Sequence, residues 1–232
     1  INNLNKAFGD FSISDLSFSV PTGSIMGFIG ENGAGKSTTI KLILDLIKRD
    51  SGDIKIFGKD NISHGIDIKE DVGIVFDESN FPETLRSCDV PHIMRHIYAN
   101  WDDAVFAKYM RKFELPSKKP FAKYSRGMKM KLVIAVALSH HAKLLILDEA
   151  TSGLDPIVRD EILDVFLDFI QDEEHSIFIS SHIISDLEKI ADYITFIHKG
   201  QIVFSESKDD LLDTYGILKC SAEDFESVPP AA

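Results

Sequence analysis

A glycine-rich segment that ends in a lysine and two hydroxyl residues, GENGAGKST, occupies residues 30–38. It matches the pattern G-x-x-x-x-G-K-S/T, in which glycines let backbone N–H groups converge on a phosphate. In such a loop the lysine reaches the β- and γ-phosphates and the first hydroxyl group binds Mg²⁺. The alternative is a glycine-rich turn that contains Lys-Ser by chance. We expect a nucleotide-binding loop whose contacts come from Gly30, Asn32, Gly33, Ala34, Gly35, Lys36, Ser37 and Thr38.

Two adjacent carboxylates, Asp148 and Glu149, follow an apolar run at residues 144–147. A buried strand that ends in acids places them at the edge of an α/β sheet where ligands bind. Because successive strand side chains point to opposite faces, we expect the two acids to do different jobs. One would hold Mg²⁺ and the other would polarise an attacking water. The alternative is a pair of surface acids that cap a strand.

Three further segments are informative only in combination. Ser125 precedes a periodic apolar segment and is a natural N-cap for a helix. Asp155 follows the acid pair within TSGLDP, and His182 ends another apolar run. Taken singly, Ser-Arg-Gly at 125–127 is typical of a turn and His182 of a structural histidine. Their order and spacing around the two stronger motifs favour a shared site.

The expected secondary structure positions these residues at the ends of strands. The apolar run 25–29 predicts a strand buried on both faces directly before the glycine-rich loop. Apolar residues at 40, 43, 44 and 47 predict a helix after the loop that ends near Lys48 and Arg49. Alternating residues predict a further strand around Phe18 and Val20. We also expect strands over 144–147 and 177–179, a helix over 157–170, and a hairpin of 194–197 with 201–204.

The middle of the chain has a different character. Prolines at 82, 91, 116 and 120 punctuate helical stretches with little strand pattern. We therefore expect a helical subdomain at about 77–139, inserted in an α/β core that spans residues 1–207. Residues 208–232 form a short C-terminal extension in this interpretation.

Composition limits the class of protein. The chain has 232 residues, with 25 Lys+Arg and 37 Asp+Glu, so its formal charge is 25 − 37 = −12. This balance argues against a nucleic-acid partner, which requires clustered cations. No apolar run approaches the ~18 residues that span a bilayer. The first residues lack the charged and apolar regions of a secretory signal, so we expect a cytoplasmic location.

With these motifs in this order, the chain resembles the nucleotide-binding subunit of an ABC transporter over essentially residues 1–206. The resemblance implies a P-loop NTPase core with an antiparallel β part and an inserted helical subdomain. It implies ATP and Mg²⁺ as ligands. It assigns Asp148 and Ser37 to the magnesium, Glu149 to catalysis, and His182 to the γ-phosphate.

The same resemblance makes residues 125–128 the signature segment, with Ser125 and Gly127 as nucleotide contacts and Asp155 as the residue that communicates between subunits. Phe8 matches the aromatic position that stacks on adenine, although a plain core or surface phenylalanine fits the sequence equally well.

Three positions depart from the family pattern. Arg126 stands where the signature usually has glycine, and Ala150 stands where proline is usual. Asp77 occupies the position of a glutamine that senses metal and water, so Asp77 is a further candidate metal ligand. The alternative is a solvated loop acid.

The resemblance implies an ATPase that powers transport through a separate membrane-embedded permease, peripheral on the inner face of the cell membrane. One phosphate loop and one signature per chain favour an ATP-dependent head-to-tail homodimer, or pairing with a second ATPase subunit. Details at 98–102 and the form of the signature resemble small bacterial exporters of phenol-soluble modulins, other peptides or drugs. The alternative functions are a soluble ABC-type ATPase that acts on nucleic acid or the ribosome, and a P-loop kinase or GTPase. The kinase or GTPase interpretation leaves the signature, Asp155 and His182 unexplained.

Overall fold

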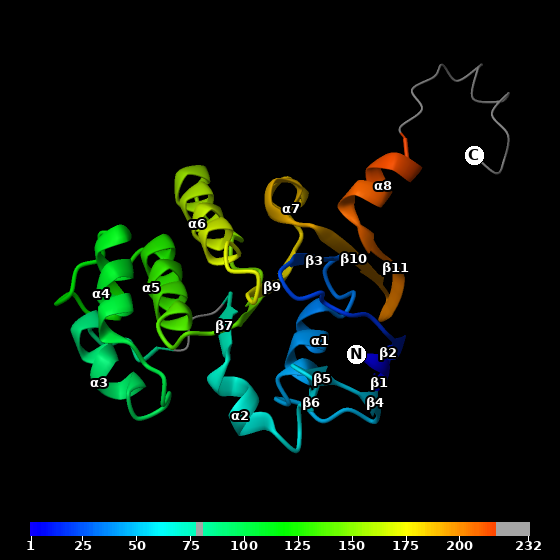
Figure 1. The fold of residues 1–232 in the computed structure, drawn as a ribbon, viewed down its shortest axis with the longest axis horizontal. Helices are drawn as coiled ribbons and strands as arrows, with labels where there is room; N and C mark the ends of the chain where they lie inside the picture. The colour runs from blue at the N-terminus through cyan, green and yellow to red at the C-terminus, as the bar shows by residue number, and fades with distance from the viewer. Residues whose placement is uncertain (78–80, 217–232) are drawn as a thin grey trace, which may run out of the picture.

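The computed structural model describes residues 1–77 and 81–216 and is organised around a six-stranded sheet (Figure 1). The strand order is β11-β10-β3-β9-β8-β7. Five strands run parallel, and β11 pairs antiparallel with β10 at the edge. The strands are β3 (Ile25–Ile29), β7 (Val72–Phe76), β8 (Leu144–Asp148), β9 (Ser176–Ser181), β10 (Tyr193–His198) and β11 (Gln201–Ser207).

The central strands are buried on both faces, as their unbroken apolar runs predict. In β8, Leu145 and Leu147 belong to one hydrophobic core and Ile146 to a second core on the opposite face. In β9, Ile177 and Phe178 alternate in the same way. This alternation places one layer of structure on each side of the sheet.

One layer consists of helix α1 (Lys36–Ile43) and a small antiparallel sheet of order β2-β1-β4. Its strands are β1 (Asn2–Phe8), β2 (Phe11–Leu16) and β4 (Ser51–Asp53), and a hairpin of β5 (Lys55–Ile56) and β6 (Lys59–Asp60) follows. Phe18, Phe28 and Phe178 stack with ring centroids 5.2–5.6 Å apart and join this layer to the central sheet. The expected antiparallel part of an α/β core is confirmed.

The other layer is helical. Between β7 and β8 the described residues contain helices and no strand, and Figure 1 shows α3, α4 and α5 grouped beside β7. The elements in this stretch are η1 (Ser87–Asp89), α3 (Val90–Met94), α4 (Asp103–Lys112), η2 (Phe121–Lys123) and α5 (Arg126–Leu138). The remaining helices are α2 (Gly65–Glu70), α6 (Pro156–Phe169), α7 (Ile184–Ile190) and α8 (Lys208–Thr214).

The inserted subdomain at 77–139 and the boundary at 207 stay predictions. Of the C-terminal extension, 208–214 form α8, and 217–232 lie outside the described residues. None of the helices in the described part of the chain is both long and apolar enough to cross a membrane.

The prediction for the end of helix α1 was wrong. The helix ends at Ile43, not at Lys48, because Asp45 adopts a left-handed conformation with φ 53°. The Leu46 N–H donates to the Lys41 carbonyl at 2.9 Å and the Asp45 N–H to the Leu42 carbonyl at 3.2 Å. These two bonds form a Schellman motif, which closes a helix and usually has glycine where Asp45 stands. The sequence therefore gives no sign that the helix ends at Ile43.

The strand expected around Phe18 and Val20 is also absent, since β2 ends at Leu16. Phe18 is buried between the exposed Ser17 and Ser19, so the alternation of apolar and polar residues here reflects alternating burial without a strand. The Phe18 N–H donates to the Ile1 carbonyl at 3.2 Å, outside any ladder.

The hairpin of β10 and β11 holds the glycine-rich loop in place through Gly200 at its tip. The Gly200 N–H donates to the Ala34 carbonyl, and the Ser14 N–H donates to the Gly200 carbonyl, each at 2.9 Å. Gly200 has φ 76°, and a Cβ there would collide with the Ser12 carbonyl. Only glycine fits both the conformation and the space.

We predict that Gly200→Ala lowers the free energy of unfolding by about 3 kcal/mol, and Gly58→Ala by only about 1 kcal/mol. Gly58 is the matched control because it has the same φ of 76° but no atom near its missing Cβ. Denaturant titrations of the two variants separate steric collision from backbone strain. Equal losses would show that the contact with Ser12 has no energetic role.

Candidate functional site

The carboxyl ends of β3, β7, β8 and β9 meet at one edge of the sheet, and the residues that follow them surround one cavity. The glycine-rich loop lies between β3 and α1, and Asp77, Glu149 and His182 directly follow the other three strands. The cavity has a volume of about 620 Å³. Its wall consists of Phe11, Glu31, Asn32, Gly33, Gly35, Lys36, Ser37, Thr38, Asp77, Glu149, Ser152 and His182.

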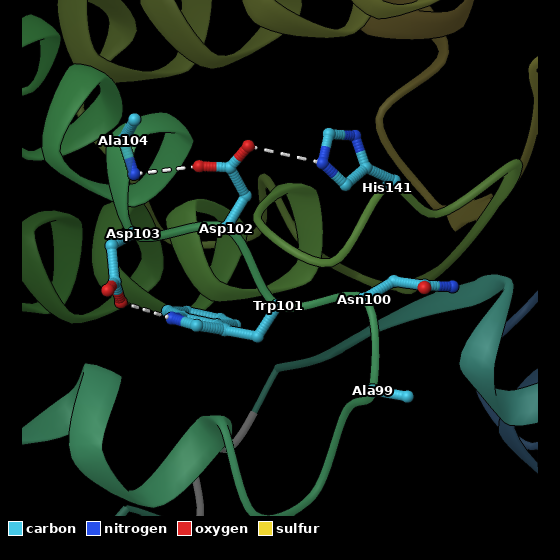
Figure 2. A pocket seen from close by; sticks show the side chains of 7 residues that line it. All are labelled: Ala99, Asn100, Trp101, Asp102, Asp103, Ala104 and His141. Carbon is cyan, nitrogen blue, oxygen red and sulfur yellow. Dashed lines mark hydrogen bonds and ion pairs between the residues drawn. The ribbon is translucent and has the colours of Figure 1, made fainter.

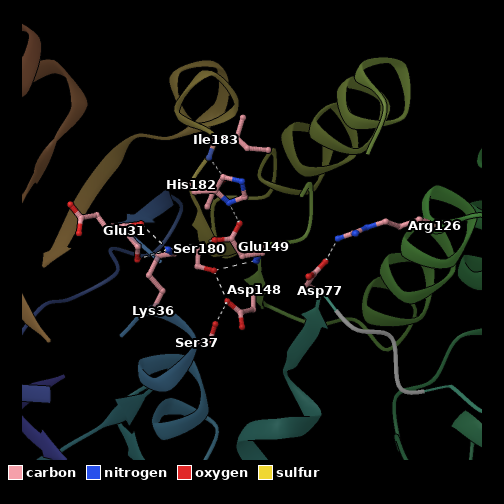
Figure 3. Close-up of polar contacts among 12 residues, drawn as sticks. Glu31, Lys36, Ser37, Asp77, Arg126, Asp148, Glu149, Ser180, His182 and Ile183 are labelled. Atoms are coloured by element: carbon pink, nitrogen blue, oxygen red, sulfur yellow. Dashed lines mark hydrogen bonds and ion pairs between the residues drawn. The ribbon is translucent and has the colours of Figure 1, made fainter. Parts of the chain in front are cut away.

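The glycine-rich loop wraps around the lysine ammonium. Lys36 is 6% exposed, and its Nζ donates to the carbonyls of Gly30 at 2.7 Å and Glu31 at 3.2 Å (Figure 3). Gly35 has φ 115°, and a Cβ there would lie 2.7 Å from Ile13 Cδ1. Helix α1 begins at Lys36, so its free N–H groups open onto the cavity. This arrangement can hold a polyphosphate.

Asp148 is held at the end of β8 by two hydroxyl groups. Ser37 Oγ donates to Asp148 Oδ1 at 3.1 Å, and Ser180 Oγ donates to the same oxygen at 2.6 Å. Asp148 is 7% exposed and Ser180 fully buried. A carboxylate beside a serine hydroxyl is the oxygen donor set that Mg²⁺ prefers together with phosphate and water. The residues present therefore fit a magnesium ion.

Glu149 lines the cavity, whereas Asp148 lies buried beside Ser37 and Ser180. The strand ends at Asp148, and Glu149 has φ 54°, which turns its side chain out of the strand pattern. Its N–H donates to Ser180 Oγ and to the Ser180 carbonyl, both at 3.1 Å. The two acids still have separate partners.

The Glu149 carboxylate lies between two cationic or potentially cationic groups. Its Oε1 is 3.6 Å from Lys36 Nζ, and a 2.5 Å hydrogen bond joins its Oε2 to His182 Nδ1. Glu149 is 17% exposed, whereas His182 is 48% exposed. Figure 3 shows His182 and Glu149 above Asp148, with Lys36 to their left. A carboxylate in this position can accept a proton from a water molecule in the cavity.

Ser125, Gly127 and Asp155 are not among the residues that line this cavity. Ser125 Oγ accepts from the Met128 N–H at 3.3 Å, which confirms it as the N-cap of α5. Asp155 caps α6 by accepting from the Val158 N–H at 3.1 Å. A Cβ at Gly127 would lie 3.1 Å from Val158 Cγ1, so these two helix ends pack together.

Phe8 ends β1 and is 42% exposed, away from the cavity wall. Phe11, opposite Phe8 in the hairpin register, lines the cavity instead. The sequence interpretation missed Phe11 and Ser180. One sign of Ser180 was available in the sequence: it is a short polar residue directly after the apolar run 177–179, at the end of a strand expected to be buried.

A second, open depression lies away from the phosphate loop, between residues 99–104 and His141 (Figure 2). Four of its polar side chains make hydrogen bonds with neighbours, namely Trp101, Asp102, Asp103 and His141. Asp102 accepts from the Ala104 and Val105 N–H groups as the N-cap of α4, and its Oδ2 lies 3.3 Å from His141 Nε2. The hydrogen bonds from Val105 and Ala104 lower the pKa of the Asp102 carboxyl. This depression is a structural junction.

Known proteins resemble the chain in sequence. A family model described as ABC transporter matches residues 13–152. The bacitracin transport ATP-binding protein BcrA of Bacillus licheniformis is 38% identical over 206 residues, which are 87% of this chain and 67% of that protein. The lantibiotic transport ATP-binding protein SrtF of Streptococcus pyogenes is 34% identical over 212 residues, 90% of each chain.

Solved structures share the fold. A structure described as the ATP-binding subunit of an ABC transporter superposes with a TM-score of 0.81 and 25% identity, covering 97% of this chain and 96% of that one. A dimeric ATP-binding cassette bound to ADP and Pi gives a TM-score of 0.78 and 19% identity, covering 89% and 97%. The expected P-loop ATPase fold is confirmed. Since the family model spans more than half of the chain, this protein belongs to the ABC transporter family as an ATP-binding and ATP-hydrolysing subunit.

Proposed function

We propose that this subunit uses ATP hydrolysis to drive the export of a peptide or drug-like molecule through a separate membrane-embedded permease. The observation that carries the ATPase part is the Glu149 carboxylate, fixed between Lys36 and His182 at the mouth of the phosphate loop. The names of the relatives, which transport bacitracin and lantibiotics, support a peptide-like cargo. The subunit would act at the inner face of the membrane, where the permease is embedded.

In the proposed chemistry, Lys36 and the N–H groups of the loop bind the phosphates. Glu149 accepts a proton from the water that attacks the γ-phosphorus, and the bond between that phosphorus and the bridging oxygen breaks. His182 holds the Glu149 carboxylate in position through its hydrogen bond. Ser37 and Asp148 would hold Mg²⁺, which neutralises charge on the phosphates.

The adenine would lie against the β1–β2 hairpin. Phe8 is the candidate for stacking, and Phe11 on the cavity wall is a second aromatic surface in the same hairpin. Asp77 is a candidate for contact with the metal because it lines the same cavity.

Assembly into a head-to-tail dimer would complete the site. Ser125, Gly127 and Asp155 lie at helix ends outside the cavity of their own chain, so a second chain is needed to bring a signature segment to the nucleotide. Two equivalent chains related by a two-fold axis satisfy this requirement twice. A different ATPase subunit could take the second place.

We predict that Lys36→Ala abolishes detectable ATP binding, whereas Lys41→Ala in the same helix leaves the dissociation constant unchanged. Lys36 supplies a buried ammonium at the loop, and Lys41 is exposed. Isothermal titration calorimetry with ATP measures both variants. Unchanged affinity in Lys36→Ala would contradict the phosphate-loop assignment.

We predict that Glu149→Gln retains ATP binding, loses about 10²-fold or more in turnover, and accumulates as an ATP-dependent dimer. The amide keeps the size of the side chain but cannot accept the proton. Turnover assays and light scattering, with and without ATP, test this result. A variant that stays monomeric at saturating ATP would reject the homodimer and favour pairing with another ATPase subunit.

A further inference from the structure

Two residues that depart from the family pattern form an ion pair with each other. Arg126, in place of a signature glycine, donates through Nη2 to Oδ1 of Asp77, in place of the usual glutamine, at 2.5 Å. Figure 3 shows the contact, which joins the end of β7 to the start of α5. The residues are 49 positions apart in the sequence. The two departures are therefore one structural feature.

The guanidinium of Arg126 also lies against a third segment. A Cβ at Gly153 would lie 2.9 Å from Arg126 Cζ and Nη1. Gly153 has φ 64°, so glycine here accommodates both the turn and the guanidinium. Its neighbour Ser152 lines the phosphate cavity. Arg126 is thereby held at the rim of this cavity.

The negative charge of Asp77 requires a compensating positive charge at this position. Its carboxylate lines the same cavity as Lys36 and Glu149, where a polyphosphate brings several negative charges. A neutral glutamine adds no charge to that cavity, but an unpaired aspartate repels the phosphates. With side chains 43% and 51% exposed, Asp77 and Arg126 interact in a setting that salt can screen.

We infer that Arg126 is a charge-compensating, positioning residue for nucleotide binding in its own chain, which neutralises Asp77 and holds it to the side of the phosphate site. Its role rests on the proposed phosphate-loop function, but its test does not require turnover. Charge compensation predicts that loss of Arg126 weakens ATP binding and loss of the Asp77 charge does not, whereas a purely structural brace predicts equal weakening.

The experiment measures ATP affinity by calorimetry for the parent protein, Arg126→Gln, Asp77→Asn and the double variant. The titrations are done in 0.1 M salt with EDTA and no Mg²⁺, so that the proposed contact of Asp77 with the metal does not contribute. Arg126→Gln should weaken binding about three- to tenfold, the order of one uncompensated charge near a surface. Asp77→Asn should not weaken it, and the double variant should return to within about twofold of the parent. Arg126→Lys should retain binding, because the charge is kept.

Arg95→Gln is the matched control. Arg95 pairs with Asp103 at the same distance of 2.5 Å and similar exposure, but outside the phosphate cavity. It should leave ATP affinity unchanged. At 1 M salt the effect of Arg126→Gln should largely disappear, since the screening length falls to about 3 Å.

Each other result overturns the inference. Equal weakening by both single variants and the double would show a structural brace. A double variant as weak as Arg126→Gln would show that Arg126 binds the nucleotide directly. A parent protein that binds no ATP would refute the proposed function itself, a result distinct from a failed rescue.

Discussion

The hydroxyl group of Ser180 fixes the geometry on which the rest of the site depends. It donates to Asp148 and accepts from the Glu149 N–H, so one buried atom holds both acids. The second bond stabilises the left-handed backbone at Glu149, which is costly for a residue with a side chain. In this conformation the Glu149 carboxylate lies 3.6 Å from Lys36 Nζ. A residue on β9 thus determines what the end of β8 can do.

The central sheet makes this arrangement rigid. Its parallel strands are buried on both faces, and their carboxyl ends carry the site residues to one edge. Ser180 is fully buried, so breaking its hydrogen bonds to β8 would leave buried polar groups unsatisfied. The geometry of the candidate site follows from strand register.

Local patterns in the sequence predicted the phosphate loop, the acid pair, the N-cap at Ser125 and the strands that are buried on both faces. These features depend on residues close together in the chain. The left-handed backbone at Glu149 was missed because it depends on a hydrogen bond to Ser180, 31 positions away. The end of α1 was missed because Asp45 fills a position that usually requires glycine. In the sequence, Asp77 and Arg126 were two unrelated departures from the family pattern. Their pairing could not be predicted, since no spacing rule connects the segment after β7 with the start of α5.

The phosphate loop owes its shape to neighbours that lie outside it. A Cβ at Gly30 would collide with the Ile197 carbonyl, Gly35 packs against Ile13, and the Ala34 carbonyl is held by the hairpin tip at Gly200. The conformation of the nine loop residues therefore depends on contacts with β2 and with the β10–β11 hairpin. Transplanting GENGAGKST alone into a foreign scaffold would carry the candidate phosphate-binding residues but not the neighbouring segments that fix the conformation of the loop. A transferable nucleotide-binding module from this protein has to include β2 and the β10–β11 hairpin.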